Sequence, residues 1–254
     1  MMFKKKKYNY GLVLSGGGTR GFAHLGVLKA LEEHDIKPDI ISGVSAGSII
    51  GALYADGHPI EDILKTLVSK NLFGFLDFLF SKDGLVEMKG FEKTLKKTLR
   101  AENIEDLKIP LIIHAVNINT VEYTAFDKGK LVEAIIASSS IPVVFPPVTI
   151  KGNQYLDGGI LNNFPVEPLV GHCKQIIGVN VNPVGRESNI KGLKKLGIRT
   201  FHLTMLNHAE MRKDKCSIFI QPENLEEFGI LDLSSAEKVF EVGYKKAVEV
   251  LKKV

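Results

Sequence analysis

Short runs of apolar residues alternate along the chain with longer segments in which apolar residues recur every three or four positions. The short runs predict buried strands at residues 10–14, 38–42, 111–118, 123–126 and 175–181, and Pro183 ends this series of strands. The periodic segments predict helices at residues 20–34, 46–56, 130–137, 190–212 and 234–252, the last beginning with the capping pair Ser234 and Glu237. Because strands and helices alternate, the pattern predicts an α/β fold with a mostly parallel sheet covered on both faces.

Length and composition favour one domain. The 254 residues are 44% hydrophobic and 24% charged, which is enough to bury one large core. No internal repeat or Pro- or Ser-rich linker divides the chain, so we expect a basic tail at residues 1–9 and a single domain at residues 10–254, helical in its last part, residues 190–254. The two cysteines, Cys173 and Cys216, indicate neither a disulfide framework nor a metal site.

The net charge of +4 does not indicate a nucleic-acid-binding surface, because the lysines are spread over helices instead of forming a stripe with aromatic residues between them. Nucleic acid is therefore excluded as a partner. The lysines at residues 4–7 could begin a secretion signal, but no apolar segment follows them, so we expect neither a signal peptide nor a transmembrane helix and predict a cytoplasmic location. This cluster is expected to be a solvated tail, although each lysine near an anionic membrane would contribute about 1 kcal/mol to binding.

One stretch, residues 71–80, departs from the regular pattern. It contains seven large apolar residues: Leu72, Phe73, Phe75, Leu76, Phe78, Leu79 and Phe80. Two interpretations are equally supported. The stretch is either a helix or loop packed on the core, or a functional segment, namely a mobile apolar flap over an acyl-chain groove or a patch that touches the membrane.

A glycine-rich loop follows the first predicted strand, and a helix begins at its end. The loop reads Ser-Gly-Gly-Gly-Thr-Arg-Gly and matches G-x-G-x-x-G through Gly16, Gly18 and Gly21. Such a loop brings backbone N–H groups close to a bound oxygen. It suits a dinucleotide pyrophosphate, with Asp35 or Asp39 on the ribose, and it equally suits the oxyanion of an acyl-transfer intermediate, at about 3 kcal/mol per donor.

The second predicted strand ends in Gly43-Val44-Ser45-Ala46-Gly47, directly before a helix. G-x-S-x-G between a strand and a helix is the nucleophile elbow, in which the two glycines permit a sharp turn that exposes the serine. An alternative is that Ser45 simply caps the helix. The elbow is favoured because an acyl hydrolase needs both this turn and a nearby loop of donors, whereas a dinucleotide site has no use for the serine.

The general base is less obvious from the sequence. The seven histidines are His24, His34, His58, His114, His172, His202 and His208, and none lies in a recognisable catalytic pattern. Asp157 follows a short strand and precedes Gly158 and Gly159, which would let the backbone pack against the elbow. Taken alone, Asp-Gly indicates an ordinary hairpin turn.

Together with the block Ala-Ser-Ser-Ser-Ile-Pro at residues 137–142 and Phe-Pro-Pro at residues 145–147, these motifs resemble the patatin-like phospholipase family over residues 10–182. The resemblance implies a three-layer α/β/α sandwich and hydrolysis of lipid acyl esters without metal or other cofactor. It implies a dyad of Ser45 and Asp157, with Gly16, Gly17 and Gly18 as oxyanion donors supported by Arg20. The Asp-Gly-Gly sequence here replaces the Asp-Gly-Ala of many members, a change that we expect to matter little.

We therefore expect a lipid or acyl-ester substrate, contact with a membrane surface at most peripherally, and an Asp157 whose pKa is raised by poor solvation. Three alternatives stay open at this point. The first is a histidine-assisted acyltransferase or esterase sharing G-x-S-x-G, and the second is a dinucleotide-binding protein that uses Gly16–Gly21. The third is a non-catalytic lipid-binding or adaptor protein on a hydrolase fold.

Overall fold

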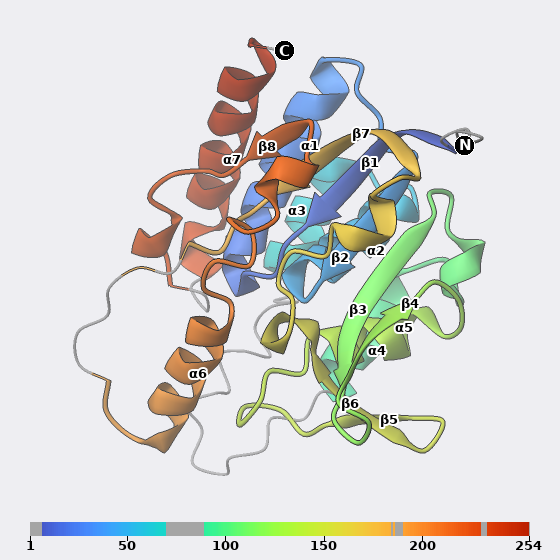
Figure 1. Cartoon of the computed structure of the whole chain (residues 1–254), viewed down its shortest axis with the longest axis vertical. Helices are drawn as coiled ribbons and strands as arrows, with labels where there is room; N and C mark the ends of the chain where they lie inside the picture. The colour runs from blue at the N-terminus through green and yellow to red at the C-terminus, as the bar shows by residue number, and fades with distance from the viewer. Residues whose placement is uncertain (1–6, 70–88, 184, 186–189, 230–232, 254) are drawn as a thin grey trace.

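The computed structural model describes residues 7–69, 89–183, 185, 190–229 and 233–253 (Figure 1). Lys4, Lys5 and Lys6 and the apolar stretch at residues 71–80 lie outside the described residues. Eight strands form a sheet in the order β5-β6-β3-β2-β1-β7-β8, with β4 also paired to β3. They are β1 Tyr8–Leu14, β2 Ile40–Val44, β3 Leu111–Asn117, β4 Glu122–Phe126, β5 Val148–Ile150, β6 Asn153–Asp157, β7 Cys173–Val179 and β8 Ile218–Ile220.

The α/β class is confirmed. Five neighbouring strands of the sheet, in the spatial order β3-β2-β1-β7-β8, are parallel to one another. The edge made of β4, β5 and β6 is antiparallel instead. The helices are α1 Phe22–Glu33, α2 Ala46–Ala55, α3 Ile60–Ser69, α4 Lys89–Thr98, α5 Leu131–Ser138, α6 Leu193–Thr204 and α7 Ala236–Leu251. Each predicted strand and helix corresponds to an element of the structure, with ends shifted by one or two residues except in the helix predicted at residues 190–212.

Three expectations about elements were wrong. A further strand, β8, follows Pro183. It was not predicted, because an apolar run of three residues is too short to be recognised from periodicity. The helix predicted at residues 190–212 spans only Leu193–Thr204, and Asn207 beyond its end has a left-handed φ of 67° that an α-helix does not accommodate. The last helix begins at Ala236 with Ser235 at its N-cap position, so the predicted capping pair is out of register.

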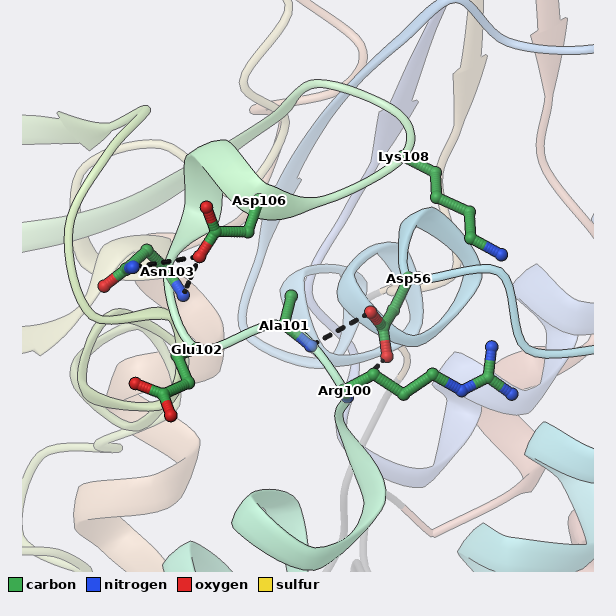
Figure 2. Close-up of a pocket in the computed structure, with 7 residues that line it drawn as sticks. All are labelled: Asp56, Arg100, Ala101, Glu102, Asn103, Asp106 and Lys108. Atoms are coloured by element: carbon green, nitrogen blue, oxygen red, sulfur yellow. Dashed lines mark hydrogen bonds between the residues drawn. The ribbon is translucent and has the colours of Figure 1, made fainter.

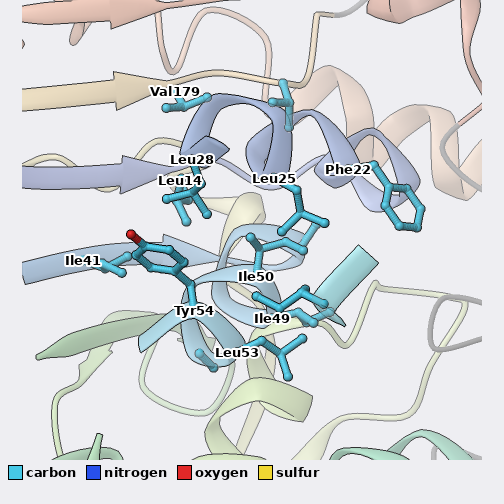
Figure 3. Close-up of a cluster of buried hydrophobic side chains, with 14 of the residues drawn as sticks. Leu14, Phe22, Leu25, Leu28, Ile41, Ile49, Ile50, Leu53, Tyr54 and Val179 are labelled. Carbon is cyan, nitrogen blue, oxygen red and sulfur yellow. The ribbon is translucent and has the colours of Figure 1, made fainter. Parts of the chain in front are cut away.

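The sheet separates two apolar cores. Leu12 and Leu14 of β1 face the larger one, which α1, α2, α5 and α7 cover, while Val13 faces a smaller one with Phe164. Figure 3 shows side chains of α1 and α2 packed near Leu14 of β1, Ile41 of β2 and Val179 of β7 in the larger core. On the second face the covering layer includes the short 3₁₀ helix η5 Glu167–Leu169, whose Leu169 lies in the smaller core. Another short 3₁₀ helix, η4 Gly158–Ile160, directly follows β6, and its Ile160 packs against the larger core.

Helices α1 and α7 lie side by side at the edge of the larger core (Figure 1). Their backbones meet at two glycines: a methyl group on Gly26 would lie 2.1 Å from the Phe240 carbonyl oxygen, and one on Gly243 would lie 2.2 Å from the Ala23 carbonyl oxygen. The C-terminal helix thus completes the layer that holds α1, the helix that follows the glycine loop. Within the described ranges, no helix has the length and apolar character needed to cross a bilayer.

Candidate active site

Strand β3 brings the two predicted catalytic segments together. One edge of β3 pairs with β4, and its other edge pairs first with β2, up to Val44 opposite His114, and then with β6, where Asp157 lies opposite Ala115. β2 runs parallel to β3 and β6 runs antiparallel, so the two strands meet end to end on the same edge. Ser45 follows the last residue of β2, and Asp157 is the last residue of β6, which places both at this junction.

Ser45 has the strained backbone of a nucleophile elbow. Its φ of 53° and ψ of −125° are unusual for a residue with a side chain and cost about 1–3 kcal/mol. Two side-chain hydroxyl groups help to hold the turn: Ser45 N donates to Ser138 Oγ at 2.9 Å, and Ser48 Oγ donates to the Ser45 carbonyl at 2.7 Å. The Ser45 side chain makes no capping hydrogen bond to α2, which argues against a purely structural cap.

The glycines of the elbow are required by close backbone contacts. A methyl group on Gly47 would lie 2.2 Å from the Leu14 carbonyl oxygen, and one on Gly43 would lie 2.7 Å from the Gly47 carbonyl oxygen. Real Cβ atoms do not approach other atoms so closely. The elbow glycines therefore allow α2 to start directly against the end of β1, beneath the glycine loop.

Asp157 is fully buried beside Ser45. Burial raises the pKa of its carboxyl group to about 7, while interactions with the Ser45 hydroxyl and the Gly159 N–H oppose this rise. Gly159 N donates to Asp157 Oδ1 at 2.8 Å, whereas Oδ2 has no hydrogen-bond partner of normal geometry among the described residues. The raised pKa that the sequence predicted is thus present, and one carboxylate oxygen remains available to accept a proton.

The turn after Asp157 also differs from the hairpin that Asp-Gly alone would indicate. β6 is followed by the 3₁₀ helix η4, in which Gly158 and Gly159 are the first two residues. A methyl group on Gly158 would lie 2.6 Å from the His114 carbonyl oxygen and 2.9 Å from Val44 Cγ2. Gly158 therefore permits the contact between the end of β6 and the end of β2.

The glycine loop lies directly against the nucleophile. A methyl group on Gly16 would lie 3.0 Å from Ser45 Cβ, and Gly18 has a left-handed φ of 58° that favours glycine. No described residue accepts a hydrogen bond from the N–H of Gly16 or Gly17, although both residues are buried. Unpaired backbone donors beside a serine are what an oxyanion site requires. Gly21, the last glycine of the pattern, ends the loop directly before α1.

Arg20 points away from this junction and ties the glycine loop to the C-terminal part of the chain. Its guanidinium donates to the carbonyl oxygens of Phe228 at 3.0 Å and Pro183 at 2.9 Å, and to Asn182 Oδ1 at 3.3 Å. Burial lowers the pKa of Arg20 to about 10, so the group is still charged at neutral pH. These hydrogen bonds hold the glycine loop to the segments that follow β7 and β8, on the side of the loop away from Ser45.

No described histidine forms a hydrogen bond with Asp157: Oδ1 accepts from Gly159 N, and Oδ2 has no hydrogen-bond partner of normal geometry among the described residues. His24 bonds the Ser15 carbonyl, and burial lowers its pKa to about 4. His114 bonds Ser42 Oγ, and burial lowers its pKa to about 3. Both side chains are therefore neutral at physiological pH and serve packing.

The dinucleotide alternative also fits the geometry poorly. Asp39 precedes β2, and its Oδ2 accepts hydrogen bonds from the N–H groups of Asn9 and Tyr10, both at 2.8 Å, at the start of β1. Asp35 lies in the same connection between α1 and β2. The glycine loop follows the other end of β1, so neither carboxylate can reach a ribose bound there.

Two further residues position the dyad through hydrogen bonds that the sequence motifs did not predict. Ser138 Oγ accepts from Ser45 N and donates to the His114 carbonyl at 2.6 Å, which anchors the elbow to β3. Asn163 Nδ2 donates to the Gly16 carbonyl at 3.3 Å, and its Oδ1 would lie 3.0 Å from a methyl group on Gly159. Asn163 therefore bridges the glycine loop and the turn after Asp157; only its position six residues after Asp157 could have hinted at this.

A pocket of about 380 Å³ lies at the opposite end of α2 from Ser45, in a region lined by Asp56, Arg100 and Lys108 among others. Figure 2 shows Asp56 pointing toward the backbone of the segment after α4. Its carboxylate accepts from the N–H groups of Arg100 at 2.8 Å and Ala101 at 3.2 Å, so this carboxylate serves structure. In the part of the chain that is described, no three His, Cys, Asp or Glu residues are grouped so that they could hold a metal ion.

A serine in a G-x-S-x-G turn between a buried strand and a helix, at the edge of a central sheet, is the nucleophile elbow that defines serine hydrolases of the α/β class. The chain matches the family described as patatin-like phospholipase over residues 12–170. It is 31% identical over 267 residues to lysophospholipase NTE1 of Kluyveromyces lactis, covering 92% of this chain and 18% of that protein. It is 29% identical to lysophospholipase NTE1 of Saccharomyces cerevisiae, covering 92% of this chain and 16% of that protein.

The fold is similar to that of VipD from Legionella pneumophila, with a TM-score of 0.56 and 16% identity over 97% of this chain and 67% of that chain. The chain therefore belongs to the patatin-like phospholipase family, as its motifs predicted.

Proposed function

We propose that the chain hydrolyses carboxylic esters of lipids, with Ser45 as nucleophile and Asp157 as general base. The observation that carries this proposal is the junction of β2 and β6 on β3, which places a strained serine beside a buried carboxylate with an unpartnered oxygen. A carboxylate with a pKa of about 7 is a far better proton acceptor than an ordinary aspartate.

In the first half of the reaction, Ser45 Oγ attacks the ester carbonyl carbon while its proton passes to Asp157 Oδ2. The carbonyl oxygen becomes an oxyanion, which the free N–H groups of the glycine loop at Gly16 and Gly17 stabilise, with Gly18 next to them. The intermediate collapses, the C–O bond to the alcohol breaks, and the alcohol leaves with the proton from Asp157. The product is an ester of Ser45 with the acyl chain.

In the second half, Asp157 takes a proton from water as the water oxygen attacks the Ser45 ester. The second oxyanion occupies the same position, and its collapse breaks the bond to Ser45 Oγ, which recovers the proton held by Asp157. A fatty acid is released, and the residues return to their starting state. Arg20 supports both steps by holding the glycine loop to the segments that follow β7 and β8.

The substrate class is inferred from the relatives. The yeast proteins are lysophospholipases by name, so we propose a phospholipid with a single acyl chain as the substrate. Such a substrate lies at a membrane surface, so peripheral membrane contact is part of the proposal. The cytoplasmic location stays a prediction.

The test of this proposal is to incubate the protein with lysophosphatidylcholine and with p-nitrophenyl esters from acetyl to palmitoyl, and to detect the free acid by mass spectrometry. Failure to release acid from any ester would contradict the proposal.

The activity is expected to rise with pH through about 7, because only the ionised Asp157 can accept the Ser45 proton. Below pH 6, kcat/KM should fall about tenfold per pH unit. The rate of p-nitrophenyl butyrate hydrolysis between pH 5 and 9 measures this, with circular dichroism at each pH to confirm that the chain is folded. A midpoint near pH 4 would show instead that the carboxylate is solvated as an ordinary aspartate is.

A further inference from the structure

Helix α6 carries apolar residues on two opposite faces. Phe201 and Met205 point inward and are 6% and 7% exposed. Leu193, Leu196 and Leu203 are 85%, 52% and 49% exposed. At 3.6 residues per turn, Leu196 and Leu203 lie in line along the helix, with Leu193 about 60° around it and the buried pair on the far side. A helix on a protein surface normally turns polar residues toward water, so this outer row of leucines lacks a partner in the described structure.

A fourth exposed apolar residue extends this row. Val143 is 65% exposed and packs on α6 at Gly197, where a methyl group would lie 3.2 Å from its Cβ. Its φ of 68° is strained for a β-branched residue, so the surrounding structure holds it in an exposed position. We call Val143, Leu193, Leu196 and Leu203 together the α6 patch.

The α6 patch borders the active site. Met205 lies on the inner face at the end of α6. A methyl group on Gly159, two residues after Asp157, would lie 2.7 Å from Met205 Cε, so the two residues are in close contact. Val143 follows the block that bonds both catalytic residues, since Ser138 Oγ accepts from Ser45 N and the Ser140 carbonyl accepts from Asp157 N at 2.9 Å. Anything that covers the patch therefore lies at the rim of the dyad.

The charge around the patch identifies the kind of partner. The sequence of α6 contains several basic residues and no acidic one, and Lys191 just before it is exposed. A second copy of the chain docked through the same patch would bring these like charges together. A row of leucines flanked by basic residues fits the headgroup and acyl boundary of an anionic lipid bilayer.

We propose that the α6 patch docks the protein on anionic lipid surfaces and so presents the rim of the Ser45 and Asp157 site to the bilayer. This inference rests on the proposed lipid esterase function for its purpose, although the docking can be measured without catalysis. It assigns to α6 a role in selecting substrates that reside in a bilayer over esters dissolved in water.

The test uses the full chain and the double variant Leu196→Gln/Leu203→Gln. Binding is measured by sedimentation with vesicles of ether-linked phosphatidylcholine and phosphatidylglycerol, which an esterase cannot cleave, and with vesicles of the phosphatidylcholine alone. Hydrolysis of dissolved p-nitrophenyl butyrate is measured in parallel. The matched control is Val170→Gln, because Val170 is 45% exposed and lies just before the start of β7, at the opposite end of the parallel strands from the dyad.

We expect wild type and Val170→Gln to bind the anionic vesicles equally, and the double variant to bind them at least about tenfold more weakly, since each leucine loses its apolar contact with the bilayer. All three should hydrolyse dissolved butyrate ester at the same rate. Equal vesicle binding by the double variant, or a wild type that prefers neutral vesicles, would overturn the docking proposal. So would a dimer in solution that the double variant dissociates. Loss of all ester hydrolysis in wild type would instead overturn the proposed function and leave the binding result intact.

Discussion

Ser45→Ala is expected to lower kcat/KM for ester hydrolysis by at least about 10⁴-fold, because no acyl-enzyme can form without the Ser45 hydroxyl. The fold should be unaffected, since the hydrogen bonds that hold the elbow use the backbone N–H and carbonyl of Ser45 and not its side chain. The measurement is initial rates on p-nitrophenyl butyrate, together with labelling by a fluorophosphonate probe. The probe should add mass to the peptide containing Ser45 in wild type and to no peptide in the variant.

Ser48→Ala is the matched control, one turn further along α2. The Ser48 hydroxyl donates to the Ser45 carbonyl at 2.7 Å, so its removal loses a buried hydrogen bond and about 1 kcal/mol of stability. It does not take part in the proposed reaction, so the activity should stay within about tenfold of wild type. If Ser45→Ala retained activity and probe labelling while Ser48→Ala lost them, the nucleophile would have been misassigned.

Asp157→Asn is expected to lower kcat by at least about 10³-fold while leaving the protein as stable as wild type, or more so, at pH 8. The activity falls because an amide cannot accept the Ser45 proton. The stability follows from the raised pKa of about 7 in the folded state, since ionising a buried carboxyl group costs free energy that the unfolded chain does not incur.

The free energy of unfolding depends on pH because the folded and unfolded chains hold the Asp157 proton with different affinity. Between the unfolded pKa near 4 and the folded pKa of about 7, the folded protein binds the Asp157 proton and the unfolded chain does not, so stability falls as the pH rises through this window. The loss amounts to about 4 kcal/mol at most by pH 8. Thermal unfolding of wild type and Asp157→Asn at pH 5 and pH 8 should therefore show the variant gaining on wild type at the higher pH.

Asp56→Asn provides the opposite pattern. Asp56 is also buried, but its carboxylate accepts hydrogen bonds from two backbone N–H groups and from His58 Nε2 at the far end of α2. Replacing Asp56 by Asn should lower the free energy of unfolding by about 1–3 kcal/mol and leave kcat unchanged.

If Asp157→Asn stayed active, the base would lie elsewhere and the histidine-assisted esterase would have to be reconsidered, with each of the seven histidines replaced in turn.

The sequence predicted the parts of this protein that depend on neighbouring residues. The glycines on either side of Ser45 permit a sharp turn, and the hydrophobic run before them predicts a buried strand, so the elbow could be recognised from one short segment. The parallel strands β1, β2, β3 and β7 were recognised in the same way, because buried parallel strands are continuous apolar runs. The helix α4 was missed, because most of its residues are polar and, among its described side chains, only Phe91 and Leu95 are buried.

Whether Asp157 could reach Ser45 depended on contacts between distant segments. Asp-Gly alone indicates a hairpin turn, and family resemblance was needed to favour the catalytic role. In the structure, the reason is that β6 runs antiparallel to β3 and ends where β2 ends, a pairing that no local pattern reveals. The same holds for Asn163, whose bond to the Gly16 carbonyl joins residues separated by 147 positions.

The sequence by itself determined the α/β alternation, the elbow, the glycine loop and the family, because each depends on backbone sterics and hydrophobic periodicity within a short segment. Only the tertiary structure decided how these segments meet. It buried Asp157 completely, which raises its pKa, and it turned the leucines of α6 outward beside Val143. Burial and exposure are properties of the assembled chain, since the same residue is solvated or shielded according to which distant segments cover it.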